Sequence, residues 1–205
     1  MIVYNISISK GKIKIQTMLL IGVMFSYVAS SMMMLLLSVV TAHEMQTIVF
    51  WTMGSLDEPD TVLIKIAAFL SILGLVTAYL FVKPMNAMRL GHEKARHLGV
   101  NTETSIRILF VTASVLTGMA VSIAGVIGFV GLIIPHVMRM LIGSDNRILL
   151  LASFIGGGGF LVLCDTIART VILPNELPTG VITGIIGGII FVVVITRKNN
   201  KIKIG

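Results

Sequence analysis

Histidine and acidic residues that can hold a metal or catalyse hydrolysis occur in two short clusters. The first, His92-Glu93-Lys94-Ala95-Arg96-His97, superficially resembles the zinc-protease pattern, which places two histidines four residues apart on one helix face. Here Arg96 holds that position, and His97 lies about 140° round a helix from His92. The second cluster, His43-Glu44, has no other histidine nearby. These residues predict neither a metal centre nor a catalytic site. We expect no cofactor and no enzyme activity in this chain.

Two further polar sites lie inside apolar stretches. Asp165 and Arg169 are four residues apart, and ionisable residues inside a membrane span usually form pairs or serve function. They can form an intrahelical ion pair, present Arg169 outward to acidic residues of a partner, or do both. His136 follows Pro135 in another apolar stretch. Capping or packing is favoured there over contact with a substrate or a metal.

The composition identifies a membrane protein with several spans. Of the 205 residues, 56% are hydrophobic and 12% are charged, and the mean hydropathy is +1.00. A soluble domain carries about twice that charged share. The net charge of +7 does not indicate nucleic acid binding, because the basic residues cluster at the ends of apolar stretches. The single cysteine, Cys164, excludes a disulfide framework.

The elements that position these residues are predicted to be helices of one all-α transmembrane domain, residues 1–205. About 20 apolar residues cross a bilayer. Six segments are expected, at Thr17–Val40, Thr61–Val82, Ser105–Ala124, Val126–Ile142, Ile148–Thr170 and Thr179–Thr196. The fourth is short, and only Gly125 separates it from the third. Pro135 removes one helical hydrogen bond and is expected to kink or break this fourth helix.

The distribution of charge predicts the orientation, with both termini in the cytoplasm. Fourteen of the 16 basic residues fall in regions assigned to the inner side, namely 1–16, 83–107, 139–147 and 197–205. The outer loop 41–60 has no basic residue, and the outer loop 171–178 has a single charge, Glu176. This is the positive-inside pattern. The exceptions, Lys65 and Arg169, lie near outer span ends, where long side chains reach water.

Glycines interrupt the fourth segment. Gly125, Gly128 and Gly131 precede Pro135-His136 in a run too irregular for a plain spanning helix. Irregular backbone at membrane depth is tolerated only inside protein or beside a water-filled path. The segment therefore indicates a transporter rather than an anchor.

Glycines also form a stripe on the last segment, where Gly180, Gly184 and Gly188 recur every four residues and share a helix face. Small residues at this spacing let membrane helices pack closely. The stripe predicts either packing alone or a helix that lines a path and shifts during transport.

The inner loop at residues 86–100 has helix-forming content, and Gly99 suits a helix C-terminal cap. It is either a short amphipathic helix on which a soluble partner docks or a solvated basic loop. No phosphate-binding loop of the Gly-x4-Gly-Lys-Ser/Thr type occurs in the sequence. If ATP drives this protein, another chain must bind it.

Five motifs follow one another along nearly the whole chain. They are Phe50-Trp-Thr-Met-Gly-Ser-Leu56, Leu90-Gly-His-Glu-Lys-Ala-Arg-His-Leu-Gly-Val100, Gly128-Phe-Val-Gly-Leu-Ile-Ile-Pro-His136, Asp165-Thr-Ile-Ala-Arg-Thr170 and Glu176-Leu-Pro-Thr-Gly180. In type and order they resemble the FecCD-type permeases of ABC importers. That family carries iron–siderophore complexes, haem and cobalamin into bacteria.

The resemblance implies a multi-pass protein of the bacterial cytoplasmic membrane that pairs with a second permease chain, identical or different, around a central pathway. An ATP-binding subunit would dock on the inner loop, and ATP would then switch the side to which the pathway opens. The residues expected at this coupling loop are Leu90, Gly91, His92, Glu93, Ala95, Leu98 and Gly99. Arg169 matches an arginine on which an extracellular solute-binding protein docks through acidic residues. The residues expected in the structural and pathway motifs are Gly128, Gly131, Pro135, His136, Asp165, Gly180, Gly184 and Gly188.

The chain departs from the family pattern in length. Family members usually have about ten spans, and the first four have no counterpart here, since residues 1–16 look like the end of a span and an inner loop. One alternative is therefore a truncated or split permease without independent transport. Another is a secondary transporter, which needs an ionisable relay or inverted repeats within the membrane. Asp165 and Lys65 are the candidates for a relay, and no convincing repeat is present.

Overall fold

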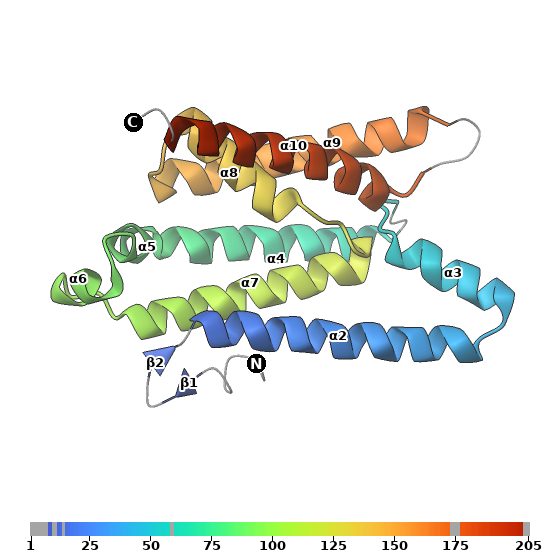
Figure 1. The fold of residues 1–205 in the computed structure, drawn as a ribbon, viewed down its shortest axis with the longest axis horizontal. Helices are drawn as coiled ribbons and strands as arrows, with labels where there is room; N and C mark the ends of the chain where they lie inside the picture. Colours follow the sequence, from blue (N-terminus) through green and yellow to red (C-terminus); the bar gives the residue numbers. More distant parts are fainter. Residues whose placement is uncertain (1–7, 10–11, 14, 58–59, 173–176, 203–205) are drawn as a thin grey trace.

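Within the described residues of the computed structural model of the chain, four apolar stretches form helices long enough to cross a bilayer (Figure 1). They are α2 (Ile15–Val39), α4 (Thr61–Leu80), α7 (Thr102–Ala124) and α9 (Asn146–Thr170). The structure describes residues 8–9, 12–13, 15–57, 60–172 and 177–202. The predicted all-α membrane fold is confirmed.

Polar residues fix where three of these helices begin. The side chains of Asp60, Asn101 and Asp145 stand at the N-caps of α4, α7 and α9, and each accepts a hydrogen bond from a backbone N–H of the first turn. Such a bond satisfies one of the donors that a helix start leaves without a partner. Helix boundaries are therefore set locally by a cap followed by an apolar run.

One of the predicted segments, α8 (Val130–Ile142), is shorter than a bilayer requires. Helix α10 spans Thr179–Ile202. The fourth segment begins at Val130 and not at Val126. Before it, residues 125–128 are not helical, and Phe129 has a φ of +66°.

The break in the fourth segment precedes Pro135 rather than lying at it. Helix α8 runs through Pro135, although the proline removes the helical hydrogen bond to the carbonyl of Gly131. The irregular backbone lies instead at the non-helical junction from 125 to 129. The prediction of an irregular fourth segment is confirmed at its glycines, whereas a break of the helix at Pro135 is not found.

Three short helices lie in regions predicted to be loops. Helix α3 (Ala42–Thr52) occupies the predicted outer loop, where Thr41 and Glu44 form a capping box. The inner loop folds as two helices, α5 (Val82–Met88) and α6 (His92–His97), instead of one. Near the N-terminus, β1 (Ile8–Ser9) pairs antiparallel with β2 (Lys12–Ile13). Most of the remaining residues before α2 lie outside the described part of the chain.

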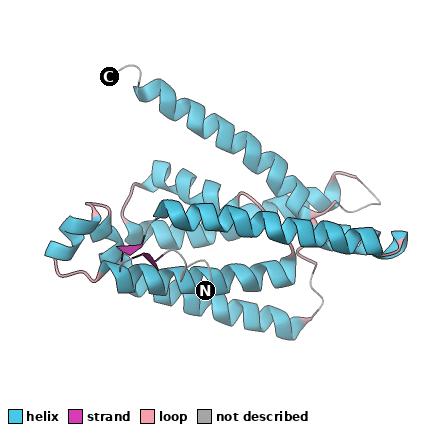
Figure 2. Ribbon diagram, turned by 60° about the horizontal axis from the view of Figure 1, so that its bottom comes forward, coloured by secondary structure: helices cyan, strands magenta, loops and turns pink. Residues whose placement is uncertain are grey.

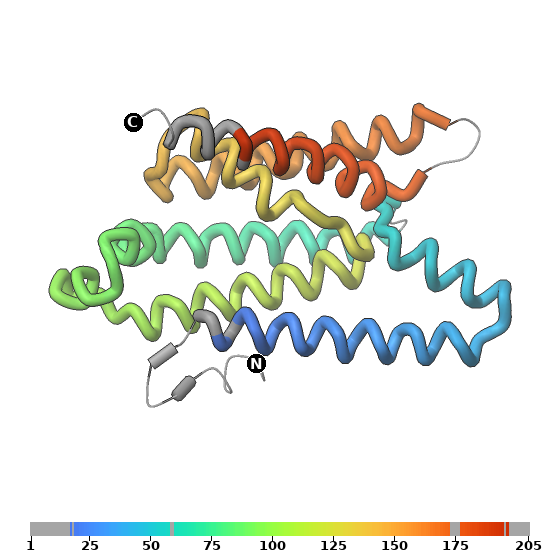
Figure 3. The backbone as a smooth tube through the Cα atoms, in the orientation of Figure 1, coloured from blue at the N-terminus to red at the C-terminus, as the bar shows by residue number. Residues whose placement is uncertain are grey.

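The bundle has two unlike ends. Figure 1 places α5, α6 and the turn between α8 and α9 at one end, which we call the α6 end. Helix α3, the α3–α4 loop and the start of α10 lie at the other, which we call the α3 end. In Figure 3, α2 and α10 form opposite edges of the bundle. Figure 2 shows α10 diverging from the other helices toward the C-terminus.

The buried interior is small and lies mainly between the C-terminal helices. Cys164 and Ala168 of α9 pack against Ile182 of α10, and Ile133 of α8 is also buried. In contrast, no described residue of α2 is buried, although the helix is strongly apolar. Apolar helices with exposed faces are typical of a protein that lipid or further membrane helices surround.

Candidate functional site

At the α6 end, α6 is held by two glycine turns. Gly91 precedes the helix with a φ of +108°, and Gly99 follows it with a φ of +79°. The N–H groups of Gly99 and Val100 bond the carbonyls of Arg96 and Ala95, at 2.9 and 3.1 Å. This is a Schellman cap, in which glycine adopts the left-handed conformation without penalty. The predicted cap at Gly99 is confirmed.

Helix α6 is anchored by one residue and exposes the others. Ala95 is fully buried, whereas His92, Glu93 and His97 are exposed. Leu90 and Leu98, which flank the helix, are 62% and 64% exposed. Large exposed leucines beside a fixed short helix form a surface suited to a protein partner. The residues expected at the coupling loop thus lie together on one projecting element.

A polar cluster joins the end of α5, directly before α6, to the turn between α8 and α9. The Asn86 Nδ2 donates to Asp145 Oδ1 at 2.8 Å, and the Asn86 Oδ1 accepts from Asn146 Nδ2 at 2.8 Å. The Arg89 guanidinium donates to the carbonyl of Ser144. Hydrogen bonds from the Arg147 backbone N–H and from Asn86 hold the pKa of the Asp145 carboxyl below its ordinary value.

Sequence reasoning missed this cluster. A polar turn before an apolar run, here Ser144-Asp145-Asn146, is a recognisable helix start. Its contact with Asn86 joins residues 59 and 60 positions apart. Nothing in a single sequence relates two such distant positions.

The predicted pathway residues of the fourth segment are divided between the non-helical junction and helix α8. Gly128 lies in the non-helical junction, while Gly131, Pro135 and His136 lie within α8. No side chain or backbone atom of the described residues lies close to where a Cβ on Gly128 or Gly131 would stand. His136 sits in the middle of the helix and is half-buried, so it packs and does not cap.

At the α3 end, Asp165 organises an ion-pair cluster. Its Oδ2 lies 2.9 Å from Arg169 Nε, and its Oδ1 accepts a hydrogen bond from Thr179 Oγ1 at 2.9 Å. The predicted intrahelical pair is therefore confirmed. Arg169 also lies 3.9 Å from Asp57 Oδ1, and its side chain is 36% exposed. Glu176, the charge predicted nearby, lies outside the described residues.

The glycines of α10 differ in their surroundings. A Cβ on Gly180 would overlap the backbone carbonyls of Met53 and Val126, so three segments meet there at backbone distance. Around Gly184 and Gly188, no described atom lies within 4 Å of such a Cβ. The close approach predicted for all three holds, within the described chain, at Gly180 only. Gly187, on another face, lies against Phe129 instead.

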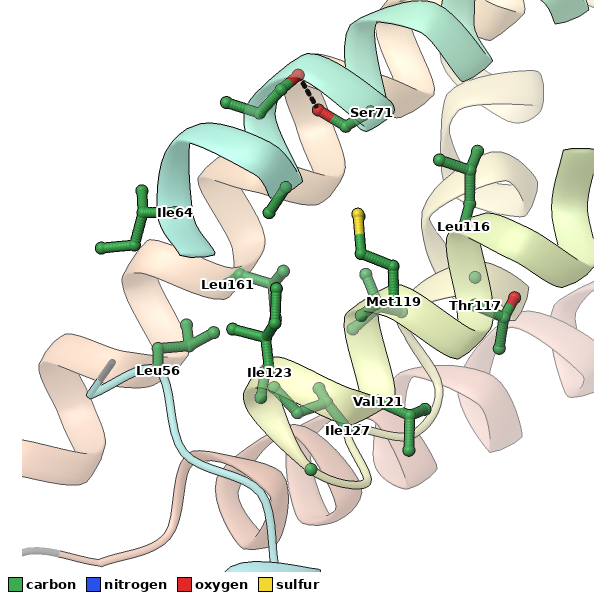
Figure 4. A pocket seen from close by; sticks show the side chains of 17 residues that line it. Leu56, Ile64, Ser71, Leu116, Thr117, Met119, Val121, Ile123, Ile127 and Leu161 are labelled. Carbon is green, nitrogen blue, oxygen red and sulfur yellow. Dashed lines mark hydrogen bonds between the residues drawn. The ribbon is translucent and has the colours of Figure 1, made fainter. Parts of the chain in front are cut away.

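An apolar cavity of about 750 Å³ opens between α4, α7 and the junction that leads into α8, where Gly131 lines it, and α9 contributes Leu161. Figure 4 shows Met119, Ile123 and Leu161 pointing into it. Its hydroxyl-bearing lining residues are Ser71 and Thr117, and Ser71 Oγ already donates to the carbonyl of Ala68. The lining resembles a helix-packing surface more than a site for a polar ligand. Across the described ranges, no three His, Cys, Asp or Glu residues gather as metal ligands would.

The chain is similar to known membrane transport proteins along most of its length. The model of the FecCD transport family matches residues 1–197. An uncharacterised ABC transporter permease, YvrB of Bacillus subtilis, is 35% identical over 92% of this chain and 53% of its own length. The hemin transport system permease HmuU of Yersinia pestis is 32% identical over 90% and 55%. The cobalamin import system permease BtuC of Halobacterium salinarum is 36% identical over 87% and 47%.

A solved structure has the same fold. It is described as an inward-facing conformation of a metal-chelate type ABC transporter, and it superposes with a TM-score of 0.86 at 29% identity. The match covers 96% of this chain and 62% of that one. This chain spans about half the length of the curated relatives that it matches.

Proposed function

This chain belongs to the FecCD transport family, and from that premise we propose that it is the membrane-spanning permease part of an ATP-driven importer. Its cargo would be an iron–siderophore or a related metal chelate. The names of its relatives support this class of cargo, since they include a hemin and a cobalamin permease. The importer would lie in the bacterial cytoplasmic membrane with both termini of this chain inside, as the charge distribution favours.

The observation that carries the proposal is the projecting helix α6. It lies in the motif that resembles the family's coupling loop, Ala95 fixes it to the bundle, and the exposed Leu90 and Leu98 flank it. An ATP-binding subunit with a complementary cleft would bury both leucines. Their burial would contribute about 1.5 kcal/mol or more each before the cost of association.

The work of this chain would be a change of conformation, not of covalent bonds. Movement of the ATP-binding subunits would displace α6, and the helices packed behind it would shift as rigid elements. A chelate passing through such a path needs weak contacts. The apolar character of α4, α7 and α8 is consistent with this requirement.

At the α3 end, Arg169 would receive an extracellular solute-binding protein. The guanidinium is partly exposed and is oriented by the carboxylates of Asp165 and Asp57. An acidic residue of the binding protein could share it, because a guanidinium has five N–H donors. Such rim contacts mainly set the association rate and the choice of partner.

A second candidate function is that of a permease part that inserts but transports only when the remainder of the permease is supplied. The exposed faces of α2 and the apolar cavity beside α4 and α7, where further membrane helices could pack, favour it. A second permease chain, identical or different, belongs to either version of the proposal.

The test is retention of the ATP-binding subunit. This chain, tagged and expressed with an ATP-binding subunit of a FecCD-type importer from the same genome, should retain that subunit through purification in detergent. Leu98→Asp should lower retention at least about tenfold, because it places a charge in the buried contact. Met45→Asp, a change at an exposed apolar residue of α3 at the opposite end of the bundle, is the control and should retain the subunit. Equal retention by both variants would contradict the proposal.

A further inference from the structure

The amide of Asn86 uses both of its ends to hold the turn between α8 and α9. Its Oδ1 accepts from the backbone N and from Nδ2 of Asn146, at 3.2 and 2.8 Å. Its Nδ2 donates to the Asp145 carboxylate at 2.8 Å. Hydrogen bonds to a charged group are about twice as strong as neutral ones. Asn146 is buried, so water competes little for its part of the contact.

Arg89, one helical turn after Asn86, reinforces this contact. Its guanidinium donates to the carbonyl of Ser144. Two residues at the end of α5 thus hold three consecutive residues, 144 to 146, which lead from α8 into α9. Asp145 also caps α9 through the backbone N of Arg147, at 3.0 Å. The contact therefore acts directly on the start of a membrane-spanning helix.

Helix α5 is in turn joined stiffly to α6. The N–H groups of Leu90 and Gly91 bond the carbonyls of Ala87 and Met88, at 3.0 and 3.1 Å, and close the turn between the helices. Helix α6 itself is linked to α7 by the ion pair of Arg96 and Glu103, at 3.4 Å. Both partners of that pair are about half exposed, and such pairs hold weakly. The stronger side-chain link from the α5–α6 element leads to α8 and α9.

We propose that Asn86 is a positioning residue that makes the α5–α6 element and the α8–α9 turn move as one body. When α6 is displaced, α8 and α9 then move with it. The irregular junction at residues 125–129 leads directly into α8. That a partner imposes the displacement rests on the proposed function. The coupled movement of the two segments does not.

The variant Asn86→Asp tests the contact with almost no change in shape. It replaces the donor that faces Asp145 with a second carboxylate oxygen, so a hydrogen bond becomes a like-charge repulsion. Losing a hydrogen bond to a charged group shifts an equilibrium about tenfold. The state in which the α8–α9 turn has separated from Asn86 should therefore become about tenfold more populated.

Spin labels at Glu93→Cys on α6 and Ile148→Cys on α9 measure the effect in the purified chain in lipid nanodiscs. Both positions are exposed, whereas native Cys164 is buried. One narrow distance distribution is expected with Asn86, and a broad or double one with Asn86→Asp. The matched control is Asn101→Asp, because an aspartate keeps the oxygen that accepts from Thr104 N. Equal widths in all three proteins would overturn the inference.

A second variant separates loss of the contact from damage to the fold. Adding Asp145→Asn to Asn86→Asp removes the repulsion, supplies a new donor and keeps an N-cap residue before α9. The narrow distribution should return. If it stays as broad as in the single variant, the effect was structural damage and the inference fails.

The assembled importer gives the functional readout. With Asn86→Asp, the complex should retain its ATP-binding subunit and hydrolyse ATP, while the chelate imported per ATP falls severalfold. If Asn86→Asp imports as much chelate per ATP as the unaltered complex, and its spin-label distances are unchanged, the positioning role is contradicted. Failure of the unaltered chain to retain the subunit would instead count against the proposed function, and the distance result would be unaffected.

Discussion

The two ends of this bundle are built by different means. At the α6 end, side chains hold separate segments together, chiefly Asn86 and Arg89 against residues 144–146. At the α3 end, backbones meet directly, since Ser55 N bonds Ala124 O at 2.9 Å and Gly180 N bonds Gly54 O at 3.2 Å. Segments that side chains hold together can shift as one body relative to the rest of the bundle, but interlocked backbones leave little freedom to move. We expect the α6 end to adjust and the α3 end to stay rigid.

The largest effect should come from filling the backbone contact at the α3 end. Gly180→Ala places a methyl group against the carbonyls of Met53 and Val126 and should cost about 3 kcal/mol of stability. Thermal unfolding in detergent, followed by the tryptophan signal of Trp51, measures it. Gly184→Ala is the matched control on the same helix, because open space surrounds that position. Its stability should be unchanged or slightly higher. Equal losses at both positions would refute the idea of a rigid backbone contact.

A smaller effect, dependent on pH, is expected at the α6 end. The pKa of Asp145 is lowered by its hydrogen bonds from the ordinary value of 3.8, so the ionised carboxylate stabilises the fold above that pH. This contribution should disappear as the pH falls through the lowered pKa. The free energy of unfolding should be measured for the unaltered chain and for Asp145→Asn from pH 7 downward. The two values should differ near neutral pH and become equal in acid. A difference that is constant with pH would show that the carboxylate charge contributes nothing.

The smallest effect is expected for the link between α6 and α7. Arg96→Ala removes an ion pair whose side chains are 59% and 48% exposed, and it should cost about 0.5 kcal/mol or less. The spin-label distance from α6 to α9 should also stay narrow. A broadening as large as that from Asn86→Asp would mean that α6 is held mainly through α7. The contacts of Asn86 and Arg89 would then not be the main ones that hold the α6 end together.

Most of the helical fold was predictable because it depends on local signals. Apolar runs of bilayer length, polar caps such as Asp145 and the glycine after α6 act within a few residues. The ion pair of Asp165 and Arg169 was predictable for the same reason, since a separation of four residues brings side chains together on any helix. Helix α3 was not predicted because its 11 residues are too few to span a bilayer, and bilayer length was the criterion for a segment.

The sequence by itself determined that this is a multi-span helical membrane protein, that its basic residues gather near predicted inner regions, and that its motifs match one family. Only the tertiary structure decided which distant residues meet. It decided that the irregular backbone of the fourth segment lies at residues 125–129 and that the helix runs through Pro135. It decided also that, among the described residues, backbone atoms approach the glycine stripe of α10 at Gly180 and not at Gly184 or Gly188. It also decided that Asn86 holds the start of α9. Local periodicity fixes the helices, but contacts across 60 residues depend on how the helices pack, and no local pattern encodes that packing.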